Sequence, residues 1–225
     1  MERLMRMLKG LTACAALVSA FALTTLTTYA NTSVSLRIAV DNEFTVFAID
    51  PNTSQLVAIG GGGNFAQAFQ FNFSAPPGSY IYVVARDLGV AGLMVTKVVF
   101  DNGAETVLSG VPGTWPDWEV NTIYRGTNLN INVPSVVTTW GGDWQAPAVG
   151  DEASTIAGDY PAYGTFDTAR FIWAPPGGAE NRLGFTGYTG PGTALFRLKV
   201  YPEPASMLAL GAGLAGLAVL RRRKK

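Results

Sequence analysis

The chain has 225 residues, of which 48% are hydrophobic and 14% charged, a length that suits one globular domain plus processing segments. Half of the 16 basic residues lie at the two ends, so Asn31 to Val200 contains 8 basic and 14 acidic side chains, a net charge of −6. This acidic balance argues against nucleic acid as a partner. Histidine is absent and the only cysteine is Cys14, which excludes thiolate metal sites and cysteine nucleophiles from the segment 31–200.

The first 30 residues have the layout of a signal peptide. Three basic residues precede the apolar run 11–23, and small residues lead up to Ala30. The run is shorter than the roughly 20 residues that a membrane-spanning helix needs. We therefore predict a signal peptide helix at 1–30, cleavage after Ala30 and delivery by the general export machinery.

The leader also allows a second interpretation. Leu11-Thr12-Ala13-Cys14 is similar to a lipoprotein signal, in which Cys14 would become the acylated first residue. In such signals the apolar run precedes the cysteine, whereas here most of it follows. The layout favours the cleavable signal peptide.

Residues 31–200 show the alternation of apolar and polar residues that is typical of β-strands. In the first predicted strand, 34–40, the side chains of Val34, Leu36, Ile38 and Val40 share one face. No segment keeps a helical periodicity over three turns, and the pattern weakens after Gly110. We predict an all-β domain, a β-sandwich or jelly roll. The predicted strands are 34–40, 44–49, 55–59, 65–73, 79–86, 93–100, 170–173 and 194–200.

Three loop motifs contain residues that could form binding sites. Gly60–Gly63 is no phosphate loop, because no Lys-Ser/Thr follows it, and we expect it to be a flexible connector. Asp41-Asn42-Glu43 and Asp101-Asn102-Gly103 offer oxygen ligands of the kind that calcium prefers, but neither has the EF-hand spacing and turn chemistry explains both. A structural calcium ion stays open as an alternative. We predict no cofactor and no metal site.

Some motifs in the first half of this domain occur together in a known family. They are Val40-Asp41-Asn42-Glu43-Phe44-Thr45-Val46, the run Pro-Pro-Gly-Ser-Tyr-Ile-Tyr-Val-Val-Ala at 76–85, and Ala91-Gly92-Leu93-Met94. Over about residues 34–120 the chain resembles galactose-binding-like jelly rolls, although Phe47-Ala48-Ile49-Asp50 departs from their usual Tyr-Val-Asn-Gly hairpin. Such domains are usually lectin-like or non-catalytic parts of carbohydrate-active enzymes, so the resemblance implies a non-catalytic role near glycans.

Four of the five tryptophans fall in loop-like sequence beside acidic residues. An exposed indole ring stacks on the apolar face of a sugar, and a nearby carboxylate accepts hydrogen bonds from its hydroxyl groups. The alternative is that these tryptophans are buried and fill the ends of the sandwich. The candidate glycan-binding residues are Trp115, Asp117, Trp118, Trp140, Asp143 and Trp144.

Carboxylate pairs in the same region raise the alternative of a glycan-active enzyme. Glycoside hydrolysis needs two carboxyl groups about 5–10 Å apart, and the candidate pairs are Asp117 with Glu119 and Asp143 with Asp151. No nucleophile motif and no histidine accompany them. We predict that the protein is not an enzyme and has no catalytic residues.

The last 25 residues have three parts. Pro202-Glu203-Pro204 is followed by the uncharged stretch Ala205–Leu220 and by the basic tail Arg221–Lys225. As a helix the stretch would be about 24 Å long, slightly short for the hydrocarbon core of a bilayer. The basic tail would hold its end on the cytoplasmic side. A plain single-pass anchor explains the helix and the cations but not the Pro-Glu-Pro.

In this order the three parts resemble the PEP-CTERM sorting signal, which occurs on exported proteins of Gram-negative bacteria that encode an exosortase and make extracellular polysaccharide. The resemblance implies that an exosortase recognises Pro202, Glu203 and Pro204 and removes the transmembrane helix 205–220, whose end is marked by Arg221, Arg222 and Arg223.

The predicted domains are therefore a signal peptide at 1–30, a β-sandwich at 31–200 and a sorting signal at 201–225. The expected protein is exported, held in the inner membrane until processing, and then found at the cell surface or outside the cell. Its expected role is that of a non-catalytic matrix component that associates with exopolysaccharide.

Overall fold

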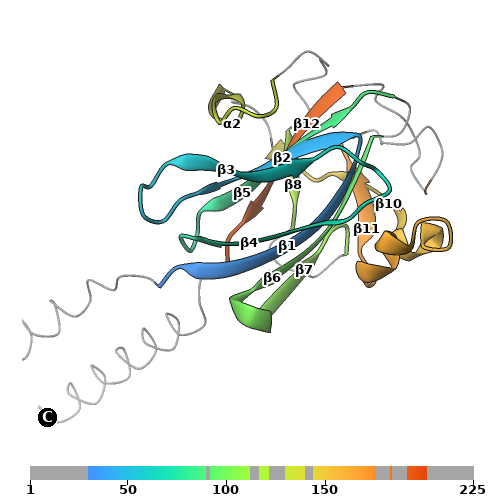
Figure 1. Ribbon diagram of the computed structural model, residues 1–225, viewed down its shortest axis with the longest axis horizontal. Helices are drawn as coiled ribbons and strands as arrows, with labels where there is room; N and C mark the ends of the chain where they lie inside the picture. The colour runs from blue at the N-terminus through green and yellow to red at the C-terminus, as the bar shows by residue number, and fades with distance from the viewer. Residues whose placement is uncertain are drawn as a thin grey trace, which may run out of the picture. The chain divides into compact units, whose positions relative to one another are not determined.

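Two antiparallel sheets make up nearly all of the regular structure in the computed structural model (Figure 1). The structure describes residues 30–89, 92–111, 117–121, 130–139, 144–175, 183 and 192–201. All of these except Ala30 belong to one compact unit that begins at Asn31. An all-β domain is thereby confirmed. The predicted transmembrane helix and all of the signal peptide except Ala30 lie outside the described residues.

Sheet A is built around the first strand of the domain. Its order is β10 (Ala148–Glu152), β11 (Arg170–Trp173), β6 (Leu93–Phe100), β1 (Thr32–Asp41) and β4 (Phe69–Ala75), and β7 (Glu105–Leu108) also pairs with β6. All these pairs are antiparallel. In β1 the register places Val34 between Phe73 and Phe100. The predicted inner face of β1 is confirmed, because Val34, Leu36, Ile38 and Val40 are all buried.

Sheet B faces sheet A. Its order is β3 (Leu56–Gly62), β2 (Glu43–Ile49), β5 (Tyr80–Asp87), β12 (Gly192–Lys199), β8 (Glu119–Asn121) and β9 (Trp144–Gln145), and all pairs are antiparallel. The chain crosses repeatedly between the sheets, since β1 and β4 belong to sheet A and the intervening β2 and β3 to sheet B. Apart from β7, the strands that the sequence missed are the short ones after Gly110, namely β8, β9 and β10.

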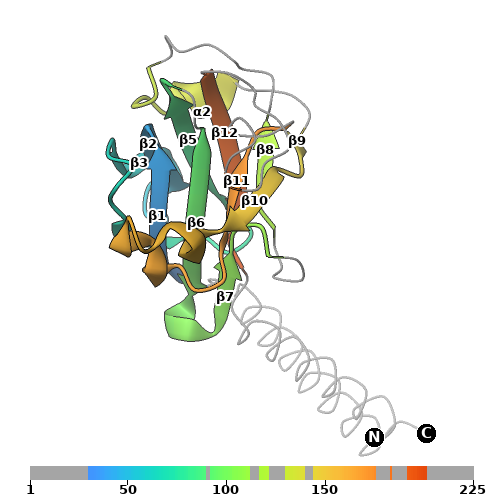
Figure 2. The same cartoon turned by 90° about the vertical axis from the view of Figure 1, so that its right-hand side faces the viewer.

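Short helices cover part of each outer face. On sheet A the 3-10 helices η2 (Ala153–Ile156) and η3 (Pro161–Thr165) lie over β1 and β6 (Figure 2). The Tyr163 ring there lies 5.6 Å from the Phe171 ring. On sheet B, Val136 and Val137 of helix α2 (Ser135–Thr139) pack with Phe47. A further 3-10 turn, η1 (Asp101–Gly103), joins β6 to β7.

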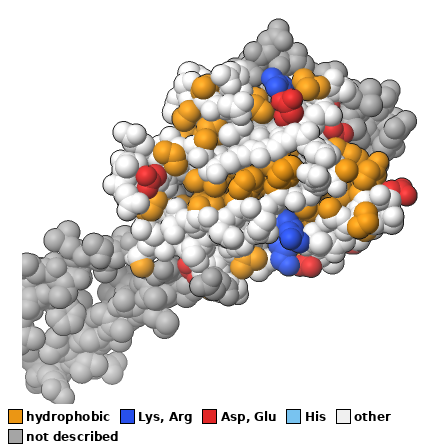
Figure 3. Space-filling view, viewed as in Figure 1, with side chains coloured by type: hydrophobic (Ala, Val, Ile, Leu, Met, Phe, Trp, Pro, Cys, Tyr) orange, Lys and Arg blue, Asp and Glu red, His pale blue; other side chains and the backbone are white. Residues whose placement is uncertain are grey.

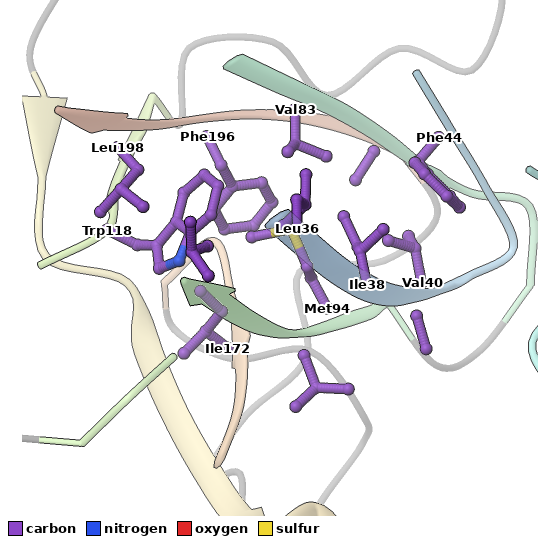
Figure 4. Packing of buried hydrophobic residues seen from close by; sticks show 14 of the residues in the cluster. Leu36, Ile38, Val40, Phe44, Val83, Met94, Trp118, Ile172, Phe196 and Leu198 are labelled. Carbon is purple, nitrogen blue, oxygen red and sulfur yellow. The ribbon is translucent and has the colours of Figure 1, made fainter. Parts of the chain in front are cut away.

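One hydrophobic core lies between the two sheets (Figure 4). Leu36 and Met94 from sheet A meet Val83 and Phe196 from sheet B, and all four side chains are fully buried. The ring of Trp173 lies 5.7 Å from that of Phe196. Burial of each large apolar side chain stabilises the fold by roughly 1.5–3 kcal/mol, so this core is the main source of stability.

The edge strands β3 and β4 lie along one seam between the sheets, where hydrophobic side chains form a visible band (Figure 3). A Cβ atom on Gly60 would lie 2.4 Å from the Phe71 ring, and one on Gly62 would lie 2.6 Å from the Phe69 ring. The expected flexible connector is therefore wrong for Gly60 to Gly62, which belong to β3. Glycine is needed there because the phenylalanine rings of β4 occupy the space of a side chain.

The two ends of the folded body are hydrogen-bonded to each other. The Thr32 hydroxyl donates to the carbonyl oxygen of Tyr201 at 2.9 Å. Val200 is also held, because its N–H donates to the Ser79 carbonyl at 2.8 Å and its carbonyl accepts from the Gly78 N–H at 3.0 Å. Hydrogen bonds therefore tie the C-terminal end of the folded body to the rest of it up to Tyr201, the last described residue.

Candidate functional site

The structure separates the residues of the predicted tryptophan-rich site. Trp115, Trp140 and Asp143 lie outside the described residues. Successive residues around β8 alternate between the faces of sheet B, so that Trp118 packs in the core whereas Glu119 points outward. Trp144 of β9 pairs with Asn121 and joins the cluster on the outer face. The described part of the prediction is therefore divided between two places.

Trp118 is a core residue with only 3% of its surface exposed. It packs in the same core as Phe196 and Leu198 (Figure 4). The prediction that a sugar stacks on this ring is wrong, because other side chains already cover its faces. For Trp118 the alternative interpretation, a tryptophan that fills the interior, is the one that the structure supports.

Trp144 belongs to a group of side chains on the outer face of sheet B, which we call the aromatic–arginine cluster. The guanidinium carbon of Arg197 lies 4.0 Å from the ring centroid of Trp144 and 4.7 Å from that of Tyr80. Tyr82 completes the group, with its ring 6.0 Å from Tyr80 and 6.5 Å from Trp144. The cluster consists of Tyr80, Tyr82, Glu119, Trp144 and Arg197, all half-buried.

Strand pairing explains why these residues meet. Arg197 of β12 stands opposite Tyr82 of β5 on one side and Glu119 of β8 on the other. Tyr80 and Tyr82 are two residues apart in β5, so both point to the outer face. The cluster is therefore held by three central strands, β5, β12 and β8, and by the edge strand β9, which carries Trp144.

The charges of the cluster are paired. Arg197 donates from Nε to Glu119 Oε2 at 2.6 Å, and the side chains of these two residues are 21% and 40% exposed. Burial raises the pKa of Tyr82, an effect that the positive charge of Arg197 opposes and Tyr80 reinforces. The Tyr82 hydroxyl is thus protonated at neutral pH and can donate a hydrogen bond. The cluster offers ring surface, fixed donors and a carboxylate acceptor side by side.

The sequence prediction missed Tyr80, Tyr82 and Arg197. The sequence contained a usable signal. In the predicted strands, Tyr80 and Tyr82 lie on the face opposite to Ile81, and Arg197 lies on the face opposite to Phe196 and Leu198. The outward positions of a strand on a solvated sheet face are normally small or polar. Two aromatic residues at such positions already indicated a surface with a further role.

A small pocket lies on the other side of β8 and β9. Its volume is about 170 Å³, and Asp117 and Trp118 are among its lining residues. Partial burial raises the pKa of the Asp117 carboxyl group above its ordinary value. The pocket is lined by Gly110, Val111, Asp117, Trp118, Ala146, Pro147 and Val149.

Of the two carboxylate pairs considered for catalysis, the structure describes both members only for Asp117 with Glu119. Glu119 is bonded to Arg197 on the outer face of sheet B, whereas Asp117 lines the pocket. Asp151 is described, but its candidate partner Asp143 is not.

The two turns considered for calcium use their carboxylates for other contacts. Glu43 forms an ion pair with Arg86, and Asp101 accepts a hydrogen bond from the Ser33 N–H at 3.0 Å. Among the described residues, no group of three or more histidine, cysteine, aspartate or glutamate side chains is arranged to hold a metal ion.

Asp41, at the end of β1, lies where burial and a neighbouring carboxylate disfavour its ionised form. Burial raises its pKa to about 6, the negative charge of Asp87 contributes to the increase, and a hydrogen bond donated by Asn42 opposes it. Between about pH 4 and pH 6 the folded chain therefore binds more protons at this site than the unfolded chain. The contribution of Asp41 to stability is fully present below pH 3.8 and decreases as the pH rises to about 6.

We predict that Asp41→Asn removes this pH dependence. At pH 7.5 the variant should melt about 2–4 °C higher than the native protein, which corresponds to roughly 1 kcal/mol after allowance for solvent screening. At pH 4 the two melting temperatures should nearly coincide, and the exposed control Asp159→Asn should show no such trend. Melting curves followed by circular dichroism measure the effect. A difference that is the same at both pH values would contradict the assignment.

The C-terminal prediction concerns residues that follow Tyr201, the last described residue. Residues 202–224 match the family described as the PEP-CTERM protein-sorting motif. The chain carries a PEP-CTERM motif. The predicted residues Pro202, Glu203, Pro204 and Arg221 to Arg223 all fall within the matched range. The recognition from sequence is confirmed, although these residues lie outside the described part of the structure.

The PEP-CTERM motif indicates an exported protein that is anchored at its C-terminus before processing, with an exosortase as its processing partner. The described residues contain no helix long and apolar enough to cross a membrane, and the predicted helix 205–220 is not among them. Ala30, the predicted cleavage residue, is exposed and precedes β1. No curated protein and no solved structure matched the chain. The resemblance to galactose-binding-like jelly rolls stays a prediction.

Proposed function

We propose that this chain is an exported, non-catalytic protein of the cell surface or extracellular matrix that binds exopolysaccharide at the aromatic–arginine cluster. The observation that carries the proposal is the position of Tyr80, Tyr82 and Trp144 on the outer face of sheet B, with Arg197 and Glu119 held between them. The two sheets are inferred to form a β-sandwich of the jelly-roll type, which their shared core supports.

The chemistry of the cluster suits a sugar polymer. Half-exposed aromatic rings offer apolar surface to the C–H faces of pyranose rings. The ion pair between Arg197 and Glu119 presents both donors and an acceptor, and because the stacked guanidinium is already ordered, binding costs little additional side-chain entropy. Since the pair is neutral overall and the domain has a net charge of −6, an uncharged glycan suits this face better than a strongly anionic one.

The sorting motif indicates how the chain reaches the outside of the cell. We infer that a signal peptide ending at Ala30 directs export, that residues 205–220 hold the chain in the inner membrane, and that an exosortase then releases it to the cell surface. The motif at 202–224 supports this route.

The binding proposal predicts that Trp144→Ala and Arg197→Ala each weaken retention by polysaccharide about tenfold or more, since each removes stacking surface or a hydrogen bond to a charged group. Affinity electrophoresis through gels that contain polysaccharide extracted from the producing cells measures the retention. Arg37→Ala is the matched control, because Arg37 is a half-buried arginine on the outer face of sheet A that donates to Gln70 at 3.2 Å.

Two results would count against binding at the cluster. One is unchanged retention of both variants when their melting curves show that they are folded. The other is an equal loss with Arg37→Ala, which would indicate a non-specific charge effect. Release of sugar products from the same polysaccharide during incubation would contradict the non-catalytic part of the proposal.

A further inference from the structure

The strands at the edges of the two sheets differ in how well they are protected against pairing with another chain. An edge strand presents unpaired N–H and C=O groups, and proteins block such an edge with a short strand, a bulge or charged side chains. Among the described strands, β9 has two residues and β7 has four. The pairing of β3 with β2 contains a register shift, and that of β10 with β11 contains another. These four edges are therefore blunted.

The edge strand β4 has none of these protections. Its seven residues pair with β1 in one continuous register from Phe69 to Ala75. The side chains on its outer face, those of Gln70, Asn72 and Ser74, are exposed and uncharged. Amide and hydroxyl groups both donate and accept hydrogen bonds, so they are compatible with a copy of themselves. The outer edge of β4 is thus open to a further strand.

The charges of the domain are kept away from this edge. Residues 51–85, which include both β3 and β4, contain no Asp, Glu, Lys or Arg, so all 8 basic and 14 acidic residues of the segment 31–200 lie outside this stretch. On the neighbouring strand, Arg37 stands opposite Gln70 and donates to its Oε1 at 3.2 Å. Like charges that face each other destabilise a strand pair. Two copies of an acidic domain therefore meet least repulsion where both are uncharged.

The inner face of β4 adds apolar surface at the same place. Phe69, Phe71 and Phe73 are only partly buried, and they pack against the core along the seam where hydrophobic side chains are visible from outside (Figure 3). Removal of this surface from water is favourable. A strand that pairs with β4 would bring its own inward side chains beside these rings. The open edge thus offers backbone hydrogen bonds and apolar contacts together.

We propose that β4 pairs with β4 of a second copy of this chain, so that sheet A continues through a two-fold symmetric dimer. Antiparallel pairing over the whole strand places the axis at Asn72, the middle one of the seven residues. Phe71 then faces Phe73 of the second copy, and Gln70 faces Ser74. Each facing pair lies on one side of the sheet, so the phenylalanine rings stay on the inner face. The two copies use the same edge, so the assembly closes at two chains.

Sedimentation equilibrium of the exported chain, purified from producing cells, tests this pairing. The native protein should show a reversible equilibrium between monomer and dimer. Asn72→Lys places two ammonium groups opposite each other at the axis and should raise the dissociation constant of the dimer about tenfold or more. Since Asn72 is exposed, the variant should fold like the native protein, which its melting curve checks.

Ser35→Lys is the matched control. Ser35 of β1 stands directly opposite Asn72 on the same face of sheet A, but one strand further from the edge. In the dimer the two β1 strands would be three strand spacings apart, about 14 Å, which exceeds the Debye length of about 8 Å at physiological ionic strength. This variant should therefore dimerise like the native protein.

A mixing experiment tests the position of the axis. Asn72→Glu alone should dissociate like Asn72→Lys, whereas an equimolar mixture of the two variants should dimerise again, because Lys and Glu then face each other. Native protein that stays monomeric at every concentration overturns the proposal. An equal loss with Ser35→Lys, or a mixture that stays monomeric, does so as well. The measurement uses no polysaccharide, so its result is independent of the function proposed above.

Discussion

Protein recovered from producing cells is expected to begin at Asn31 and to lack the basic tail Arg221–Lys225. The apolar stretch 205–220 would serve as an anchor only until an exosortase reads Pro202-Glu203-Pro204. Proline disfavours helix and central strand and restricts the residue before it, so we expect this tripeptide to be presented in the extended form that proteases bind. Glu203→Ala removes the only charge of the tripeptide. We expect this variant to keep the tail in nearly all molecules.

Intact-mass spectrometry of the native protein and the variant measures the outcome. Glu152→Ala, a change at an exposed glutamate of the folded body, should be processed like the native chain. A native protein that still ends at Lys225 would contradict the processing proposal and favour a plain membrane anchor. An N-terminus at Cys14 with a lipid attached would replace the cleavage after Ala30 by the lipoprotein alternative.

Gly62→Ala is expected to lower the free energy of unfolding by about 1–3 kcal/mol, the usual cost of overpacking. The added Cβ atom would lie 2.6 Å from the Phe69 ring and 2.8 Å from the Phe44 ring. These rings pack edge to face with centroids 5.4 Å apart, so neither can move without disturbing the other. In a domain of this size the melting temperature should fall by roughly 3–10 °C.

Gly63→Ala is the matched control for this variant. A Cβ atom at Gly63 would approach only Glu43, at 3.6 Å, which is an ordinary contact. Alanine also reduces the entropy of the unfolded chain, so this variant should be as stable as the native protein or slightly more stable. Equal effects of Gly62→Ala and Gly63→Ala in thermal unfolding would show that the seam is not packed as described.

Much of the fold could be predicted from local pattern. The strand predicted at 93–100 coincides with β6, and that at 170–173 coincides with β11, because alternation of apolar residues reports directly on a face turned to the core. The short strands β8 and β9 have three and two residues. No periodicity can be recognised over so few positions. β8 pairs with β12, which lies far along the chain, and β9 pairs with β8.

The glycine run shows how pattern alone can mislead. Gly60 and Gly62 interrupt the apolar alternation, so the sequence favoured a connector. In the structure the rings of Phe71 and Phe69 stand over these glycines and supply the missing apolar contact. The compensation comes from another strand, β4, and a window of neighbouring residues does not contain it.

The candidate site was predictable only in part. Sequence reasoning selected Trp144 and Asp117 because exposed tryptophan and carboxylates suit sugars, but the same reasoning selected Trp118, which is buried. Which tryptophan reaches the surface depends on the strand register, and register is a long-range property. Arg197 was missed for the same reason, since its partners Tyr80 and Glu119 come from two other strands.

The bond between Thr32 and Tyr201 has a consequence for release from the membrane. Hydrogen bonds hold both Val200 and Tyr201, so the hydrogen-bonded body extends to the residue directly before the sorting motif, which starts at Pro202. A protease that cuts before Pro202 would have to bind Val200 and Tyr201 in extended form. These residues would then lose their hydrogen bonds to Ser79 and to Thr32 of β1, and β1 would be less firmly held. A cut after Pro202 leaves the hydrogen bonds of Val200 and Tyr201 in place. The pairing of the two ends therefore favours a mature protein whose C-terminus still carries a short segment with proline.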